Sequence, residues 1–593
     1  MELSKLVVSN ADKLNLFHLY VTSDYEVKKM MKEFDFYMIR FYREEFSKSS
    51  ILWFQYPKGN MFWYVDFKNY VEKEFLSKPD CKYKKEWLDF LNTLKDEIRM
   101  EALGLKLELN SITASKVLRL QIKYQLRDYQ AFDLAQFLVK YKYGLDRGLI
   151  LSEPRTGKTR IALAAAAETR LPGDLVLVVC PKTAAIGWMS EVDKLNEGSM
   201  LFSANLVSKI SDLKTLKPAH ALLNIRIISY DLFKKLNLTQ LRQITSKIRN
   251  ITLICDEVHR LRNFKTIQSE ALFKFKEFCE RDKVDLGIVG LTGTPAVKEN
   301  TDIFGTLCLI NDSKIQFKPY YNAFNCFKEY FYYCEDTSFG KVAKALRREE
   351  EINYIIQSCS VQTKQKELDF FKDYKKVYKK VLLDLDEDQK IIYNSVYDTM
   401  EYDEDIDCQN KLVQLVRLQQ ICIDPYGLVA SYERLSPKLK WVVKFAQANK
   451  GFKFIVACKK TTPLKHLQKV LDGVGIKYAS ILGEYNYKLR FEQIEEFTKN
   501  PEVSIMLLQL DTGREALTLP AAKAIVFLDR DFAQGYNEQA EARMTPVDGS
   551  PCTKYVIDLI MAGTKEEQIY NTLVVKKESI DAINTVFKPR ISW

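Results

Sequence analysis

The residues best suited to chemistry are Gly157, Lys158 and Thr159, which stand together in the first third of the chain. Backbone N–H groups of a glycine-containing loop and of a helix N-terminus attract phosphate groups. A lysine directly after such a loop binds the β- and γ-phosphates, and the next hydroxyl ligates Mg²⁺. The triplet therefore predicts a site for a nucleoside triphosphate together with Mg²⁺.

A second chemical group is the adjacent pair Asp256 and Glu257, which follows an apolar run at 251–255. One carboxylate of such a pair can hold Mg²⁺, usually through water. Its neighbour can orient and deprotonate the water that attacks the γ-phosphate. With Lys158 upstream, the pair predicts a site for ATP hydrolysis in which Lys158, Asp256 and Glu257 are catalytic.

These residues must be positioned by a strand, a tight loop and a helix. The apolar run at 149–151 predicts a buried strand, the loop covers 152–157, and the alanine-rich stretch at 161–167 predicts a helix. The loop departs from the general phosphate-loop pattern at one position. Ser152 stands six residues before Lys158, where that pattern has glycine.

Both halves of the chain repeat an alternation of apolar runs with helical patterns. The runs lie at 149–151, 175–180, 225–229, 251–255 and 286–291, and again at 454–458, 478–482, 504–509, 524–528 and 554–559. Continuous apolar strands that alternate with helices are typical of parallel α/β sheets. Polar residues follow the strand ends, which is where ligands bind in open parallel sheets. The predicted fold class is therefore α/β with two parallel sheets.

The composition bounds the class of protein. The 593 residues predict several domains, and 89 basic against 78 acidic residues leave a formal charge of +11, which suits a polyanionic partner without proving one. Twelve cysteines without a CxxC pair and only four histidines argue against structural zinc and a disulfide framework, and favour a reducing intracellular compartment. No apolar run reaches about 18 residues. The N-terminus also lacks a signal-peptide pattern, so no membrane contact is expected.

Residues 1–115 are rich in aromatic side chains and predict an accessory domain. The run at 51–67 predicts a β-hairpin around turn residues 57–60, and helical patterns lie at 25–46 and 84–102. A small α+β core accounts for the aromatic residues, and a surface that stacks nucleic-acid bases is the alternative. The domain is a candidate for substrate recognition.

Taken in order, the motifs of this chain resemble those of the Swi/Snf-like branch of superfamily 2 helicases, which are DNA-dependent ATPases. The resemblance runs from about Leu126 to Asn571. The segment 126–130 resembles the motif that reads adenine, and 152–159 resembles the phosphate loop of the family. The resemblance implies that Mg²⁺ is held by Thr159 and Asp256. It also implies an ATP site formed by Arg127, Gln130, Ser152, Glu153, Pro154, Arg155, Thr156, Gly157, Lys158, Thr159 and Arg160.

Further segments match the same family. Those at 180–182, 229–230, 256–259 and 291–295 resemble motifs Ia, Ib, II and III, with Trp188 also fitting, and those at 511–517 and 539–543 resemble motifs V and VI. The residues implied to couple hydrolysis to movement are His259, Thr292, Gly293, Thr294 and Gln539. The residues implied to hold the nucleic-acid backbone are Lys182, Thr183, Ser229, Tyr230, Lys459, Lys460, Thr512 and Arg514.

One departure concerns motif VI, in which the family carries two arginines three positions apart. Arg543 matches the first, whereas Pro546 stands at the second. Both arginines normally reach the γ-phosphate, and an arginine finger is worth roughly 10³–10⁵ in rate. Losing one would slow hydrolysis unless Arg514 or Arg530 replaces it.

The resemblance implies an α/β fold of two RecA-like motor lobes with helical insertions and an N-terminal α+β accessory domain. The expected domains are the accessory domain at 1–115, the first lobe at 116–310, helical insertions and a linker at 311–435, and the second lobe at 436–593. ATP and Mg²⁺ are the implied cofactors.

The implied function is that of an ATP-dependent translocase that moves along duplex DNA and remodels forks, junctions or protein–DNA complexes. DNA, duplex or branched, is the implied partner, and a monomer is expected. Frequent lysine, isoleucine and tyrosine hint at an AT-rich bacterial or phage genome, so the expected location is the cytoplasm, or the nucleus of a eukaryote. Two alternatives stay open: an ATP-gated nucleic-acid clamp with weak turnover, and an RNA-directed or strand-separating helicase.

Overall fold

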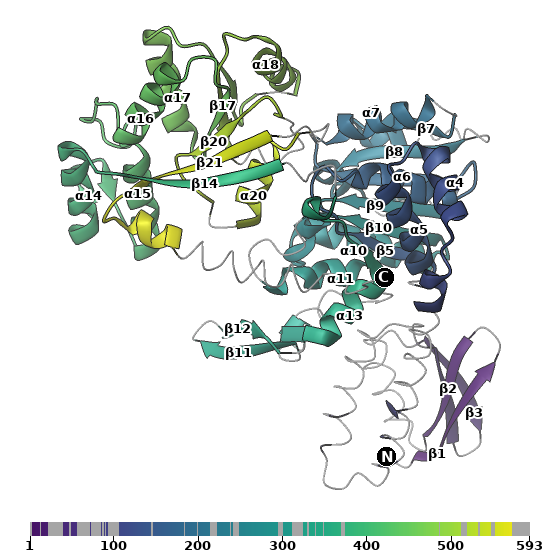
Figure 1. Cartoon of the computed structure of the whole chain (residues 1–593). Coiled ribbons are helices and arrows are strands. Elements are labelled where there is room, and N and C mark those ends of the chain that lie inside the picture. Colours follow the sequence, from purple (N-terminus) through teal and green to yellow (C-terminus); the bar gives the residue numbers. More distant parts are fainter. Residues whose placement is uncertain are drawn as a thin grey trace. The chain divides into compact units, whose positions relative to one another are not determined.

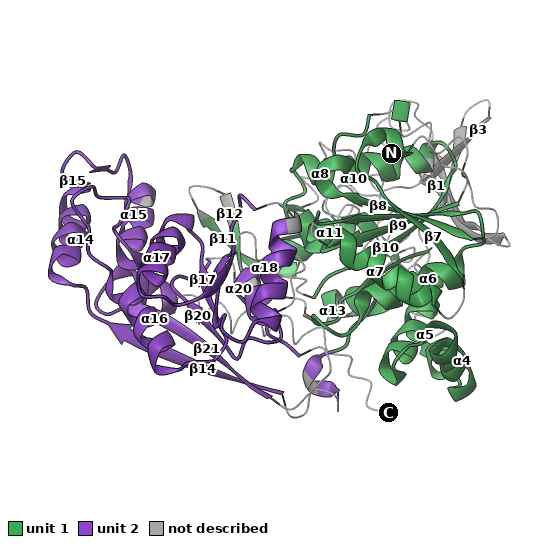
Figure 2. Ribbon diagram, turned by 90° about the horizontal axis from the view of Figure 1, so that it is seen from above, with its two compact units in different colours: residues 1–363, 583–593 green, residues 364–582 purple. Residues whose placement is uncertain are grey.

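The computed structural model describes the strands at 3–11, 14–21, 40–46 and 49–55, single positions between 72 and 92, and most of 106–571. Within that last range it leaves out 144–145, 183, 198–199, 214–221, 238, 241–247, 249, 294–299, 311–323, 326, 329–330, 338–339, 348, 369–373, 486, 511–518, 532–533 and 547–551. The chain forms two compact units, one built on residues 1–363 and the other on residues 364–582 (Figures 1 and 2).

The first unit is organised around a seven-stranded parallel sheet with the strand order β13-β5-β10-β9-β6-β8-β7. Its strands are β5 (Arg147–Ile150), β6 (Leu175–Cys180), β7 (Phe202–Leu206), β8 (Leu223–Ser229), β9 (Asn250–Asp256), β10 (Asp285–Leu291) and β13 (Ser360–Val361). β6 is buried at every position, and β8, β9 and β10 are buried except at their ends, which explains why these strands read as continuous apolar runs. All five strands predicted in this half are confirmed.

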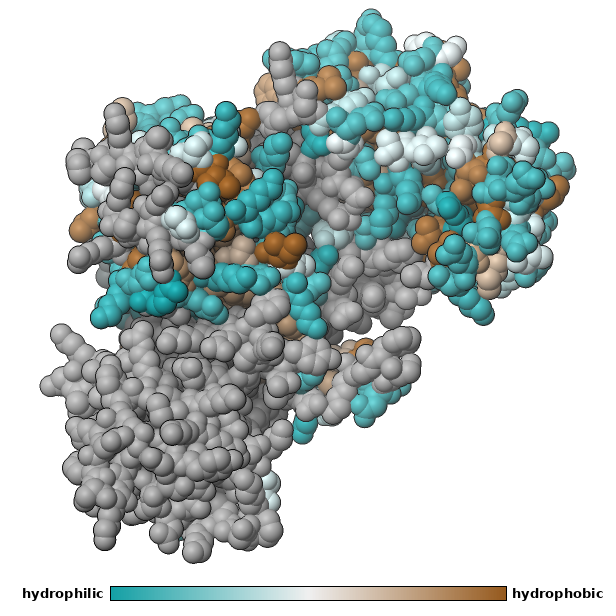
Figure 3. All heavy atoms as spheres, turned by 180° about the vertical axis from the view of Figure 1, so that it is seen from behind, coloured by the Kyte–Doolittle hydropathy of each residue, from teal (hydrophilic) through white to brown (hydrophobic). Residues whose placement is uncertain are grey.

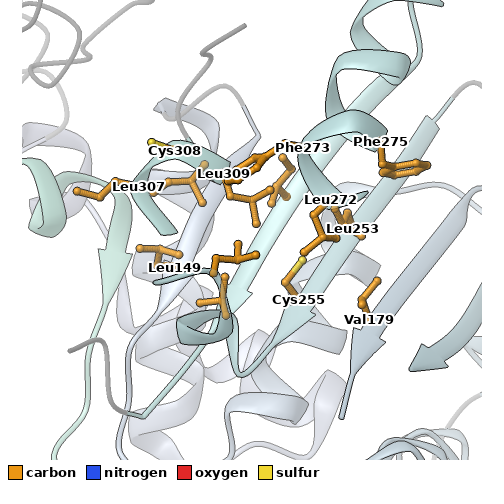
Figure 4. Packing of buried hydrophobic residues seen from close by; sticks show 14 of the residues in the cluster. Leu149, Val179, Leu253, Cys255, Leu272, Phe273, Phe275, Leu307, Cys308 and Leu309 are labelled. Atoms are coloured by element: carbon orange, nitrogen blue, oxygen red, sulfur yellow. The ribbon is translucent and has the colours of Figure 1, made fainter. Parts of the chain in front are cut away.

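Helices cover both faces of this sheet. One face packs against α5 (Asp128–Tyr143), α6 (Lys158–Thr169) and α7 (Ala185–Asn196), and the other against α10 (Ile267–Arg281) and α11 (Ile303–Ile310). Successive strand residues alternate between the two cores because side chains in a strand point to opposite faces. Figure 4 shows the second core, where strand residues such as Leu253 and Val179 meet Phe275 of α10 and Leu309 of α11.

The second unit is organised around a six-stranded parallel sheet with the order β14-β21-β20-β17-β19-β18. Its strands are β14 (Tyr374–Leu383), β17 (Phe454–Cys458), β18 (Tyr478–Ile481), β19 (Ile505–Gln509), β20 (Ala524–Phe527) and β21 (Cys552–Met561). Its helices include α14 (Glu387–Thr399), α15 (Lys411–Ile423), α16 (Pro437–Ala448), α17 (Thr461–Gly473), α18 (Tyr487–Lys499) and α20 (Gln534–Ala542). Two parallel sheets with helices on their faces confirm the predicted α/β fold class.

The N-terminal strands form a separate antiparallel sheet of order β1-β2-β4-β3. They are β1 (Leu3–Ala11), β2 (Leu14–Val21), β3 (Arg40–Phe46) and β4 (Ser49–Gln55). The helical pattern predicted over 25–46 is wrong for Arg40–Phe46, because pairing with β4 overrides the local pattern there. Residues 25–39 and the second half of the predicted hairpin, 56–67, lie outside the described residues.

The interval 311–435 was expected to hold helical insertions and a linker, and it does contain helices, among them α14 and α15, but it also contains strands. It contains the hairpin β11 (Tyr332–Thr337) and β12 (Gly340–Leu346), and helix α13 (Glu349–Cys359), and it supplies β13 to the first sheet and β14 to the second. The basic run at 375–380 lies in β14, at the edge of the second sheet. β14 mixes lysines with apolar residues, and none of its positions is buried, as suits an edge strand.

The described surface in Figure 3 is mostly hydrophilic, with hydrophobic side chains in small, scattered groups. Among the described helices, none combines the length and the apolar character that a membrane span requires.

Candidate nucleotide-binding site

The predicted phosphate loop joins β5 to α6 through a tight turn. Arg155 and Gly157 both adopt a positive φ, of 70° and 88°, and α6 begins at Lys158. The Lys158 ammonium folds back over the loop, where it donates to the carbonyls of Ser152 at 2.8 Å and Glu153 at 3.2 Å. The loop therefore wraps around the lysine that would face the phosphates.

The acidic pair lies close enough to Lys158 to influence the pKa of its ammonium. Burial lowers the pKa of Lys158, while the nearby carboxylates of Glu257, Asp256 and Glu153 act in the opposite direction. β9 ends at Asp256, and Glu257 begins the next turn with a φ of 52°. The structure thus brings together the two groups that the sequence predicted from positions about a hundred residues apart.

Asp256 is held from several directions. Its Oδ2 accepts from the indole N–H of Trp188 at 2.9 Å, its Oδ1 accepts from the backbone N–H of Glu257 at 2.9 Å, and its backbone carbonyl accepts from the Tyr230 hydroxyl at 2.7 Å. Burial raises the pKa of Asp256 to about 6, and the neighbouring charge of Glu257 adds to this, whereas Trp188 and Lys158 oppose it.

These residues fit a bound Mg²⁺. Burial and a neighbouring carboxylate make the charged form of Asp256 unfavourable, and a nearby cation would favour that form. Carboxylate and hydroxyl oxygens are the ligands that Mg²⁺ prefers. Asp256 and Thr159, in the first turn of α6, would hold the ion.

The predicted coupling residues of the first sheet lie together. His259 Nδ1 is 3.0 Å from Thr292 Oγ1 and 3.2 Å from Glu257 Oε2, so it bridges the ends of β9 and β10. Gly293 follows on, and a Cβ there would lie 2.9 Å from Pro154 of the phosphate loop. This close approach explains why glycine stands at 293. Thr294 lies outside the described residues.

Gln130 is bound to the protein at both ends of its amide. Its Oε1 accepts from the Arg127 backbone N–H at 2.9 Å, and its Nε2 donates to the Thr156 carbonyl at 3.0 Å. The Tyr129 hydroxyl donates to the same carbonyl at 3.2 Å. A Cβ at Gly157 would lie 2.0 Å from Gln130 Nε2, so this amide packs directly on the loop. The reading of adenine by Gln130 stays a prediction.

Arg160 does not join this cluster. Its guanidinium forms an ion pair with Glu191 of α7 and donates to the Gln125 carbonyl at 3.0 Å. These partners fasten α6 to its neighbours. The position of Arg160 therefore gives no support to its predicted contact with ATP.

The predicted nucleic-acid contacts of the first unit have different surroundings. Lys182 is exposed after β6, and Thr183 lies outside the described residues. Ser229 caps the short helix α8 (Tyr230–Phe233), because its hydroxyl accepts from the Leu232 N–H. Tyr230 is only 2% exposed and uses its hydroxyl on Asp256, so its position argues against the predicted contact with nucleic acid and favours a role in holding the acidic pair.

In the second unit, Lys459 and Lys460 follow β17. The Lys459 ammonium lies 3.1 Å from an Asp531 carboxylate oxygen, and Lys460 is exposed at the N-terminus of α17. Thr512 and Arg514 lie outside the described residues.

Arg543 directly follows α20, and its backbone carbonyl accepts from the Leu519 N–H at 2.9 Å. Gln539 is buried within the same helix. Arg530, one of the two predicted substitutes for a second finger, is held elsewhere. Its guanidinium binds both carboxylate oxygens of Asp558 and one of Glu541, and its side chain is 10% exposed. These bonds give no support to the suggestion that Arg530 reaches the γ-phosphate, which stays a prediction.

Sequence reasoning missed two sets of contacts. The bonds from Trp188 of α7 and Tyr230 of α8 to Asp256 join elements that are far apart in sequence, and no local pattern indicates them. Ser152 Oγ accepts from the backbone N–H of Thr363 at 3.1 Å, across 211 positions of sequence. The serine at 152, where glycine was expected, was the one available signal that this position has a partner.

Comparison with known proteins connects this site to a family. Residues 63–427 match the family described as SNF2-related domain, and residues 437–545 match the helicase conserved C-terminal domain. The chain is 23% identical over 459 residues to the DNA repair and recombination protein RAD54B of Gallus gallus, covering 69% of this chain and 47% of that protein.

It is also 24% identical over 340 residues to the SWI/SNF-related matrix-associated actin-dependent regulator of chromatin subfamily A-like protein 1 of Drosophila melanogaster, covering 56% of this chain and 41% of that protein. The chain thus spans less than half the length of these two relatives. A solved SWI2/SNF2 ATPase core of Sulfolobus solfataricus in complex with dsDNA aligns with 77% of this chain and 92% of its own, at 19% identity and a TM-score of 0.33.

The SNF2-related match covers more than half of the chain and includes the loop at Lys158, the acidic pair and the contact between His259 and Thr292. This chain belongs to the SNF2-related family.

Proposed function

We propose that the protein is an ATP-dependent DNA translocase, which hydrolyses ATP to move along duplex DNA and to remodel forks, junctions or protein–DNA complexes. The observation that carries the proposal is the placement of Lys158 beside Asp256 and Glu257, at the carboxyl ends of the strands of a parallel sheet. Membership of the SNF2-related family and relatives named for DNA repair and recombination support it.

In the proposed reaction, the loop amides and Lys158 bind the triphosphate, and Thr159 and Asp256 hold Mg²⁺. When bound, the ion neutralises charge that develops on the phosphates. Glu257 orients the attacking water and accepts its proton. By its match to motif VI, Arg543 is assigned the stabilisation of charge on the γ-phosphate in the transition state.

We further propose that His259 and Thr292 report the state of the triphosphate to the strand-end loops that hold DNA. Lys182 and Lys460 are suited to this contact, because both are exposed lysines that directly follow strands. Lysine contacts to phosphates position a protein on DNA without reading its sequence. We propose that the protein acts as a monomer. We also propose that it acts in a compartment that contains DNA, which is the cytoplasm of a bacterium or the nucleus of a eukaryote.

The test is the steady-state ATPase rate with plain duplexes, forks, four-way junctions, single-stranded DNA and RNA. We expect strong stimulation by duplex or branched DNA, and little by RNA. Lys158→Ala and Glu257→Gln should each abolish hydrolysis, because the first removes the phosphate ligand and the second the base, while the melting temperature stays unchanged. Unaltered rates in both purified variants would remove the site assignment.

A low rate that DNA does not change would instead indicate the ATP-gated clamp. Two observations motivate this clamp as the alternative to a translocase. Pro546 stands in motif VI, and Arg530 is bound by Asp558 and Glu541. Stimulation by RNA equal to that by duplex DNA would favour the RNA-directed alternative.

A further inference from the structure

A short segment at the end of the first unit lies along the phosphate loop. β13 pairs with β5, and beyond it the Leu151 N–H donates to the Val361 carbonyl and the Glu153 N–H to the Thr363 carbonyl, both at 2.9 Å. The Thr363 N–H donates in return to Ser152 Oγ at 3.1 Å. Thr363 therefore binds the first two residues of the loop through its main chain.

The side chain of Thr363 is bound to a different element. Its hydroxyl donates to the Asp133 carboxylate, which belongs to α5. Asp133 is 7% exposed, Thr363 is 6% exposed, and Ser152 is fully buried. Buried polar groups of this kind are expensive to separate, so the three residues form one fixed junction between α5, the loop and the segment after β13.

The helix α5 holds both ends of the phosphate loop. Gln130 donates to the Thr156 carbonyl near the end of the loop, and Asp133 holds Thr363, which binds its beginning. Residues three apart in a helix lie on the same face, so one face of α5 supports both contacts. Lys140, further along α5, donates to the Ser360 carbonyl at 2.6 Å and fixes the segment a second time.

The junction lies at the boundary between the two units of the chain. The boundary between the two units falls at Thr363 and Lys364, and after it the chain contains the short 3₁₀ turn Gln365–Glu367 and then β14 of the second sheet. A shift of Ser152 or Glu153 acts on Thr363 through two hydrogen bonds, and Thr363 begins the connection that leads to β14.

We propose that Thr363 is a positioning residue that fixes the start of the phosphate loop and links triphosphate occupancy to the chain entering the second unit. The inference rests on the proposed function, since it requires a triphosphate at Lys158. It adds a route for that signal that does not pass through His259 and Thr292. Asp133 is the anchor that holds Thr363 in register with Ser152.

The test is amide hydrogen exchange of the whole protein, followed by mass spectrometry, with and without Mg²⁺ and ATPγS. We expect ATPγS to slow exchange in peptides spanning 359–366 by at least about threefold, because occupancy makes local opening of the junction less frequent. Calorimetry on the same samples reports whether ATPγS binds. Binding without any change in these peptides would overturn the proposal and leave the proposed function intact, whereas a failure to bind would overturn both.

Substitutions at Thr363 and Asp133 test the role of the junction directly. Thr363→Val replaces the hydroxyl with a methyl group of similar size, so exchange at 359–366 should rise without nucleotide and the slowing by ATPγS should be lost. Its affinity for ATPγS should stay within about threefold of wild type, because Lys158 and the loop amides remain. DNA stimulation of its ATPase should fall more than its basal rate.

Thr363→Ser should restore the wild-type exchange response, and Asp133→Asn, which keeps an acceptor, should stay close to it. A Thr363→Val protein that matches wild type in both exchange and DNA stimulation would contradict the proposed role.

Discussion

Asp256 is fixed by donors that come from elements other than its own strand. Trp188 of α7 binds one carboxylate oxygen, and Tyr230 of α8 binds the backbone carbonyl. Groups that hold a metal-binding carboxylate orient it and tune its charge, and their loss typically reduces metal affinity by about 10–100-fold. At the scale of single residues, Trp188 therefore belongs with the nucleotide site although it is not expected to touch the nucleotide.

The Trp188→Phe substitution tests this role. It keeps the buried ring but removes the indole N–H, so the apparent affinity for Mg²⁺ in ATP binding should fall by about tenfold or more. Calorimetric titration of ATP at several Mg²⁺ concentrations measures the change. Trp441→Phe, in the second unit, is the matched control and should leave this affinity unaltered. Equal effects of the two substitutions would refute the assignment.

Lys140 carries a prediction about pH. Burial lowers its pKa from 10.5 to about 8 in the folded protein. At pH values between about 8 and 10.5, Lys140 holds its proton in the unfolded chain and loses it in the folded chain. The contribution of Lys140 to the free energy of unfolding therefore rises with pH. Relative to Lys140→Met, the wild type should gain about 3 kcal/mol between about pH 7 and about pH 10.5. Urea unfolding of both proteins at the two pH values measures this, and a constant difference would disprove it.

At the scale of elements, α20 is held by a buried charge cluster. Arg530, which follows β20, binds Asp558 of β21 and Glu541 of α20, and the Tyr378 hydroxyl of β14 donates to Glu541 at 2.9 Å. Arg543 follows α20 directly. The cluster thus sets the position of the helix directly before the proposed arginine finger, and it occupies the guanidinium of Arg530.

Arg530→Met should therefore destabilise the second unit strongly. It leaves the carboxylates of Asp558 and Glu541 without their main cation, and breaking a buried ion pair typically costs about 3–5 kcal/mol. The control is Arg434→Met, because Arg434 pairs with Asp388 at the surface, where the side chains are 62% and 45% exposed. That control should cost less than about 1 kcal/mol. Urea unfolding followed by fluorescence compares the two, and similar losses would argue against a structural role for the cluster.

At the scale of the whole molecule, the excess of 11 positive charges and the exposed lysines after strand ends fit a protein that holds a polyanion. Neutralising DNA phosphates releases counterions, so binding weakens as salt rises. The two units each present such lysines, Lys182 in the first and Lys460 in the second. The number of phosphates held can therefore be read from the dependence of DNA affinity on salt.

We expect duplex affinity to fall by about 10³ between about 50 and about 200 mM salt, which corresponds to roughly six phosphates. Changing Lys182 and Lys460 together to alanine should reduce the slope of log affinity against log salt by about two phosphates. Changing Lys390 and Lys444, which are also exposed, to alanine should leave the slope as it is. Fluorescence anisotropy with a labelled duplex measures all three proteins. The same slope in every protein would exclude the two strand-end lysines as contacts.

The sequence by itself was enough for most of the two parallel sheets. The bounds predicted for β6 and β17 agree with the structure, because a strand buried on both faces must be apolar at every position. β7, β13 and β14 escaped prediction. They lie at sheet edges, where short or mixed sequences suffice because only one neighbour covers them.

The candidate site also contains residues that the sequence predicts and contacts that it does not. Lys158, Thr159, Asp256 and Glu257 could be predicted, because their roles depend on short patterns at the ends of apolar strands. The bonds from Trp188 and Tyr230 to Asp256, and from Thr363 to Ser152, could not. Side-chain contacts between segments far apart in sequence depend on the order of strands in the sheet, and only the tertiary structure decides that order.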